Sequence, residues 1–87
     1  MMKAMEIGLG SVVRSKAGRD KGKLMAVIGI EENGLLLCDG KERRLEKPKL
    51  KNPKHVAVTA TVLDPGTMAT DRSLKKALSA VEGANMN

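Results

Sequence analysis

Two apolar runs, separated by a polar stretch bounded by glycines, organise the first third of the chain. The runs cover about residues 11–16 and 24–30 and are rich in β-branched and other aliphatic side chains. Short runs of this kind predict strands. Gly18 and Gly22 bound the stretch between them, and glycine adopts the positive φ of a tight reversal without steric cost. The pattern predicts a hairpin whose turn is formed by Gly18, Asp20 and Gly22, with the Asp20 side chain bonded to neighbouring backbone N–H groups.

Further short runs continue the strand pattern as far as residue 63. Asn33-Gly34 is a strong hairpin signal, and it precedes an apolar run at 35–39. A short basic strand at 41–45 and an alternating run at 55–63 complete the series. Short strands separated by frequent turns are typical of small β-barrels. We therefore expect a mostly β fold, a small closed or nearly closed barrel of about five strands over residues 7–63.

The last part of the chain changes from strand-like to helical periodicity. A turn linker at 64–70 precedes a short helix predicted over 71–82, with Thr70 or Asp71 as its cap. Four apolar residues recur at helical spacing on one face: Leu74, Ala77, Leu78 and Val81. We expect this stripe to pack on the barrel, and the alternative is a surface for a partner. Residues 1–6 are expected to form a flexible leader, Gly83 to end the helix, and 83–87 to fray.

Positive charge is concentrated in two segments. The formal net charge is +6. Residues 14–23 hold five cations and one anion, and residues 41–54 hold seven cations and two anions, whereas the rest of the chain has more anions than cations. Such asymmetry is typical of a surface that binds a polyanion. The alternative is that the lysines only maintain solubility, although such surfaces usually mix both signs. The candidate nucleic-acid contacts are Arg14, Lys16, Arg19, Lys21, Lys23, Arg43, Arg44, Lys47, Lys49, Lys51 and Lys54.

The second basic segment contains a stretch that alternates lysines with two prolines. Pro48 and Pro53 stiffen residues 47–54 and keep them out of a central strand position. A stiff arm would hold its four lysines forward, towards backbone phosphates. The alternative is a solvated surface loop. The four lysines are Lys47, Lys49, Lys51 and Lys54.

The missing aromatic residues narrow the class of partner. The sequence has no Phe, Tyr or Trp. Grooves for proline-rich peptides and platforms for single-stranded bases are built from aromatic side chains, so both functions are disfavoured. We expect recognition of folded or duplex nucleic acid through its shape and backbone. The arginines add planar guanidinium groups that bind phosphate or guanine with two hydrogen bonds.

Residues that carry catalysis or bind metals are sparse. The chain has one cysteine and one histidine, so we expect neither a metal site nor an enzyme, and no cofactor or small-molecule substrate. Cys38 lies in an apolar run and is expected to be a buried structural thiol, and His55 a structural residue. No run approaches the roughly 18 apolar residues of a membrane span. We expect a cytoplasmic monomer that does not bind membranes.

Two groups of residues resemble a known family. Gly10-Ser11-Val12-Val13, followed by residues 17–23 and alternating apolar positions, resembles the KOW motif of ribosomal proteins and transcription elongation factors. Leu37-Cys38-Asp39-Gly40, Arg43-Arg44 and Lys54-His55-Val56 are similar to the large-subunit ribosomal protein family fourteen of archaea and eukaryotes. The chain as a whole resembles the small bacterial KOW-domain RNA-binding proteins related to that family.

The resemblance implies an SH3-like barrel of the KOW type that binds structured RNA, ribosomal RNA above all, and takes part in translation. The hairpin turn would lie on the RNA, which implicates Arg19, Lys21 and Lys23, with Arg43 and Arg44 beside them. The ribosomal members are longer, so a stoichiometric ribosomal subunit and an accessory, ribosome-associated factor both stay open. The alternative function is a protein-interaction module of a transcription or translation complex with an acidic protein partner.

Overall fold

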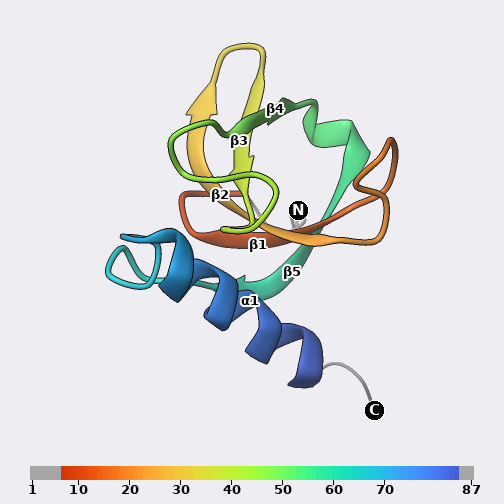
Figure 1. Cartoon of the computed structure of the whole chain (residues 1–87). Helices are drawn as coiled ribbons and strands as arrows, with labels where there is room; N and C mark the ends of the chain where they lie inside the picture. The colour runs from red at the N-terminus through yellow and green to blue at the C-terminus, as the bar shows by residue number, and fades with distance from the viewer. Residues whose placement is uncertain (1–6, 85–87) are drawn as a thin grey trace, which may run out of the picture.

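Five strands, one 3-10 turn and one helix make up the structure (Figure 1). The computed structural model describes residues 7–84, and the expected leader at 1–6 and the end of the expected tail, 85–87, lie outside the described residues. The elements are β1 (Ser11–Ser15), β2 (Leu24–Glu31), β3 (Gly34–Cys38), β4 (Lys49–Lys51), the 3-10 turn η1 (Pro53–His55), β5 (Val56–Val62) and α1 (Asp71–Ala84). The prediction of a mostly β fold with a C-terminal helix is confirmed.

All five strands belong to one antiparallel sheet in the order β4-β3-β2-β1-β5. The edge strands β4 and β5 are joined by η1 alone, so the sheet curls until its two edges approach at one end (Figure 1). The sheet stays open between these edges, which corrects the prediction of a closed barrel. The reason is local: β4 has three residues, all paired with β3, and Pro53, which directly follows Asn52, has no backbone N–H to extend the pairing.

The short strand predicted at 41–45 is wrong, because these residues form a loop. The Asp39 carboxylate accepts hydrogen bonds from the backbone N–H groups of Lys41 and Arg43, both at 2.8 Å. The Arg43 carbonyl in turn accepts from the N–H groups of Asp39 and Gly40, at 2.9 and 3.1 Å. These bonds satisfy the backbone locally, as Asp side chains do in turns. The fourth strand therefore forms later, at Lys49–Lys51.

The helix begins where the sequence predicts and extends further. The Thr70 Oγ1 accepts from the N–H of Ser73 at 3.1 Å, so Thr70 is the cap. The Asp71 carboxylate instead accepts from the N–H of Leu45 at 2.8 Å and ties the helix to the 39–46 loop. The helix continues through Gly83, so the prediction that this residue ends it is wrong. A glycine costs only about 1 kcal/mol in a helix interior, which the packing of the preceding turns offsets.

Two apolar clusters fill the two faces of the sheet, because successive side chains of a strand point to opposite faces. On one face, Val12 and Cys38 pack with Leu74 and Leu78 of α1. This confirms the prediction that the helical stripe packs on the sheet. On the other face, inside the curl, aliphatic residues and one methionine form the second cluster: Val13, Met25, Val27, Leu35, Leu37 and Val56.

Candidate nucleic-acid interface

The turn between β1 and β2, residues 16–23, lies on the surface. Gly18 and Gly22 have φ of +80° and +88°, which confirms the prediction that both glycines provide the reversal. The N–H of Gly22 donates to the Ser15 carbonyl at 2.8 Å and closes the turn. Arg19 and Lys21, between the two glycines, are exposed. The turn therefore presents cations from a backbone that is fixed at both ends.

Asp20 has a different role from the predicted one. It is only 3% exposed, and its Oδ2 accepts from Nη2 of Arg43 at 3.3 Å instead of from the backbone of the turn. Lys23 forms a second ion pair with Glu42, and the hydrogen bond to Glu42 raises the pKa of Lys23. Both pairs join the turn to the 39–46 loop, so the two basic segments meet at one surface.

We expect the Asp20–Arg43 pair to hold the turn against the loop. Arg43→Met leaves the buried Asp20 carboxylate without its cation and should lower the free energy of unfolding by about 2 kcal/mol. Asp20→Asn combined with Arg43→Met should lose much less than the sum of the two single changes, because the second change then removes no further partner. Urea unfolding of the three variants measures this coupling, and additive losses would show that the two side chains do not interact.

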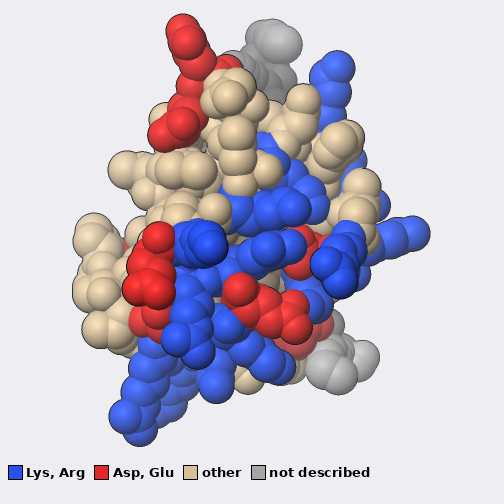
Figure 2. Space-filling view, turned by 45° about the horizontal axis from the view of Figure 1, so that its top comes forward, with Lys and Arg blue, Asp and Glu red and all other residues tan. Residues whose placement is uncertain are grey.

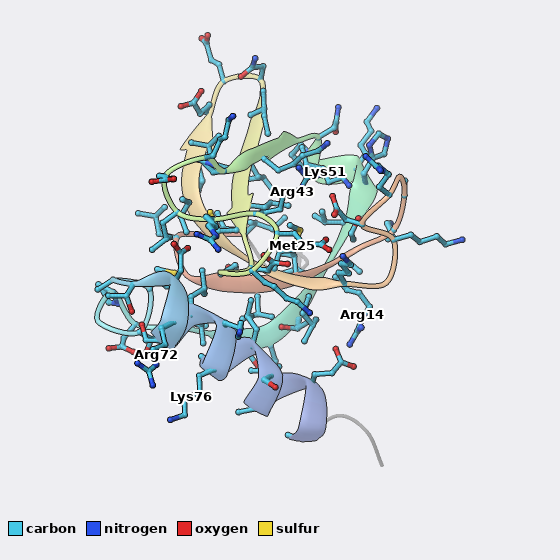
Figure 3. All side chains as sticks on the ribbon, in the orientation of Figure 1. Arg14, Met25, Arg43, Lys51, Arg72 and Lys76 are labelled. Atoms are coloured by element: carbon cyan, nitrogen blue, oxygen red, sulfur yellow. The ribbon has the colours of Figure 1, made fainter. Side chains whose placement is uncertain are left out.

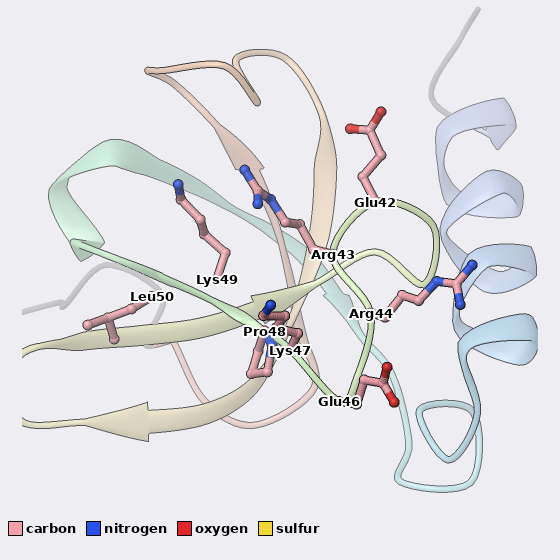
Figure 4. Close-up of a pocket in the computed structure, with 8 residues that line it drawn as sticks. All are labelled: Glu42, Arg43, Arg44, Glu46, Lys47, Pro48, Lys49 and Leu50. Atoms are coloured by element: carbon pink, nitrogen blue, oxygen red, sulfur yellow. The ribbon is translucent and has the colours of Figure 1, made fainter.

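Three cations from three elements share grooves in pairs: Arg19 of the turn, Arg43 of the loop and Lys49 of β4. Arg19 and Arg43 line one groove, Arg43 and Lys49 line a second, and Arg19 and Lys49 line a third. In the close-up of the second groove, Arg43 and Lys49 point to the same side, whereas Arg44 points towards α1 (Figure 4). We call Arg19, Arg43 and Lys49 the three-cation surface. Lys and Arg side chains gather over this part of the molecule, with acidic side chains among them (Figure 2).

The other predicted contacts fall into two groups. Four lysines are exposed and free to meet a ligand: Lys16, Lys21, Lys47 and Lys54. Lys47 lines the groove that Arg43 and Lys49 share. Arg14 is committed within the fold, since its Nη1 donates to the Gly22 carbonyl at 2.8 Å and to Glu82 at 3.3 Å.

Lys51 does not project forward, which corrects the prediction that residues 47–54 form a stiff arm with all four of its lysines held forward. It pairs with Leu35 in the register of β4 and β3, and the alternation of the strand turns its side chain inward while Leu50 is exposed. Lys51 is 8% exposed, and its Nζ donates to Ser15 Oγ and to the Ala17 carbonyl, both at 3.0 Å. The arm is thus an edge strand followed by η1.

Sequence reasoning missed the cations of the helix. Arg72, Lys75 and Lys76 are exposed, and Lys75 lines a groove together with Lys41 and Lys23. Arg72 and Lys76 point away from the sheet, on the opposite side from Arg43 and Lys51 (Figure 3). Their spacing of three and four residues predicts one helical face, a signal that a count of charge by segment does not reveal.

Cys38, the only cysteine of the sequence, lies in the core. Cys38 is fully buried, as predicted, and its Sγ donates to the Arg44 carbonyl at 3.2 Å. Burial raises the pKa of Cys38 to about 11, so it is a thiol at neutral pH. Within residues 7–84, no three His, Cys, Asp or Glu side chains gather as metal ligands do. In the same range, no helix is long and apolar enough to cross a membrane.

No protein-family model matches the chain, and no curated protein matches it. The resemblance to KOW-domain proteins therefore stays a prediction from the residues that carry it, and the function has to be argued from the surface itself.

Proposed function

We propose that this protein binds structured RNA through the phosphates of its backbone, with the three-cation surface at the centre of the contact. The observation that carries the proposal is that every two of Arg19, Arg43 and Lys49 share a groove, although they come from three separate elements. A lysine-rich surface that serves only solubility needs no such convergence. Each neutralised phosphate releases condensed counterions, so clustered cations supply affinity without a deep cavity.

The backbone and ion-pair contacts that hold these cations in place favour a partner that is itself rigid. Arg43 is held by Asp20, the turn is closed by backbone hydrogen bonds, and Lys49 lies on a paired strand. With the Arg43 side chain and the backbones of Arg19 and Lys49 fixed in this way, the surface can match a rigid row of phosphates at a small cost in entropy. Because the sequence has no aromatic side chain, bases have no stacking platform, which favours folded or duplex RNA over single strands.

We further propose that the curled sheet is an open variant of the SH3-like fold of the KOW type, and that the RNA is ribosomal. In support, β1 and β2 flank the motif-like turn, and the 3-10 turn η1 joins the two edge strands. A ribosome-associated protein of the cytoplasm fits the net charge of +6. The acidic partner of a protein-interaction module is the competing ligand, and the experiment below includes it.

Fluorescence anisotropy with a labelled RNA hairpin tests the proposal. We expect saturable binding that an unlabelled hairpin reverses, and weaker competition by a single strand of the same length. An acidic peptide of equal charge is the matched competitor. Competition by the peptide as strong as that by the hairpin would favour a protein partner, and no binding of the hairpin would contradict the proposed function.

A further inference from the structure

One groove combines a buried cation with the absence of any carboxylate. It lies between the β1–β2 turn and β4, and we call it the Lys51 groove. Three other grooves on residues 7–84 each include carboxylates, from Asp20, Asp39, Glu42, Glu46 or Glu82. A further groove, on α1, also lacks a carboxylate, but its three cations, Arg72, Lys75 and Lys76, are all exposed. The Lys51 groove has three cations, an imidazole and an amide but no carboxylate. Its lining residues are Ala17, Gly18, Arg19, Lys49, Leu50, Lys51, Asn52 and His55.

The ammonium of Lys51 is a buried cation that has no anionic partner among the residues the structure describes. Its Nζ has three N–H donors. Two are taken by neutral oxygens, Oγ of Ser15 and the carbonyl of Ala17. A buried charge without a counter-charge is costly, so the site is electrostatically incomplete.

The groove reaches Lys51 beside Gly18, because Lys51 is one of its lining residues. A Cβ on Gly18 would lie 3.7 Å from Nζ of Lys51, in ordinary contact. Because residue 18 is a glycine, no side chain covers the ammonium from this direction. Ser15 Oγ donates to the Ala17 carbonyl at 3.0 Å, so the acceptors that hold Lys51 are themselves held in place. The ammonium is therefore fixed beneath an open position.

We propose that the Lys51 groove is a binding site for one phosphate group, with Lys51 Nζ at its floor and Arg19 and Lys49 at its sides. The ammonium donates to one phosphate oxygen, and the guanidinium of Arg19 binds two others as a planar fork. The proposal rests on the proposed function where the phosphate belongs to RNA, because Arg19 and Lys49 also belong to the three-cation surface. Inorganic phosphate has the same chemistry and is the first probe.

Titration of the ¹⁵N-labelled protein with inorganic phosphate, at constant ionic strength maintained with chloride, tests the site. We expect the amide signals of Ala17 and Gly18 to shift and saturate, with no comparable shift in α1. Lys51→Met, which keeps the length of the side chain, should weaken phosphate binding about tenfold, the loss typical of one charged hydrogen bond. Lys49→Gln is a second variant at a more exposed position, and it should weaken binding severalfold with the fold intact.

Arg72→Gln with Lys76→Gln is the matched control, because it removes two positive charges from α1 and should leave the Ala17 and Gly18 titration unchanged. Equal weakening by the control, or no saturable shift at Gly18, would overturn the site. If Lys51→Met does not fold, the Lys49→Gln titration decides alone. Saturable phosphate binding without binding of the RNA hairpin would support the site and contradict the proposed function. Hairpin binding that both groove variants leave unchanged, without a phosphate shift, would do the reverse.

Discussion

The affinity for a structured RNA hairpin should fall by about 10³-fold when the salt concentration rises from about 50 to 200 mM, if about six phosphates are contacted. The candidate cations, both those of the three-cation surface and the exposed lysines beside it, are sufficient in number for this many contacts. The loss follows from counterion release, because added salt reduces the entropy gained when phosphates are neutralised. Anisotropy titrations at several salt concentrations measure the slope of log K against log salt.

The slope of log K against log salt also tests single lysines. Each exposed lysine that contacts a phosphate and is replaced by glutamine should reduce the slope by about one unit. Lys47→Gln is a suitable test, because Lys47 is exposed and lines a groove of the interface. An affinity that hardly changes with salt would contradict binding through backbone phosphates.

Leu74→Ala should lower the free energy of unfolding by about 3 kcal/mol, a change of more than a hundredfold in the folding equilibrium. Leu74 is 0% exposed and packs against Val12, Leu24 and Cys38. The cost combines lost burial with the cavity that remains, and a chain of this length has little stability to spare. Urea unfolding followed by circular dichroism measures the difference.

Leu9→Ala is the matched control for this prediction, because Leu9 is 62% exposed. It should change the free energy of unfolding by no more than about 0.5 kcal/mol. Equal losses for the two variants would mean that burial does not explain the effect. Unchanged stability of Leu74→Ala would show that α1 does not pack on the sheet. The apolar face of α1 would then be a surface for a partner.

The elements that depend on neighbouring residues were predictable from the sequence. Gly18 and Gly22 specify the first turn because their positive φ is a local property of glycine. The spacing of Leu74 and Leu78 specifies the buried face of the helix in the same way. These features need no knowledge of distant parts of the chain.

One local contact was missed: the Asp39 carboxylate bonds to the backbone N–H groups of Lys41 and Arg43 and holds residues 41–45 in a loop. Features that depend on contacts between distant residues were not predictable. The partner of Asp20 is Arg43, which lies far along the chain. The burial of Lys51 follows from the register of β4 against β3, and a one-residue shift would turn the same side chain outward. Composition alone sets none of these.

The candidate interface, too, was predictable only in part from the sequence. The concentration of charge in residues 14–23 and 41–54 is visible in the sequence. The meeting of Arg19, Arg43 and Lys49 around shared grooves depends on how the sheet curls. The ion pair of Arg14 with Glu82 likewise depends on how α1 packs on the sheet.

In the proposed complex, RNA is bound by cations that the fold holds at one surface, and the total charge of the chain does not explain the binding. The sharpest test of this compares two double variants with the same loss of charge. The first is Arg19→Gln with Lys49→Gln, and the second is Arg72→Gln with Lys76→Gln on the helix, where both side chains point away from the sheet. At equal salt, we expect the first to weaken hairpin binding more than about tenfold and the second to change it less than about threefold, with both still folded. Equal weakening by the two variants would contradict binding through the three-cation surface.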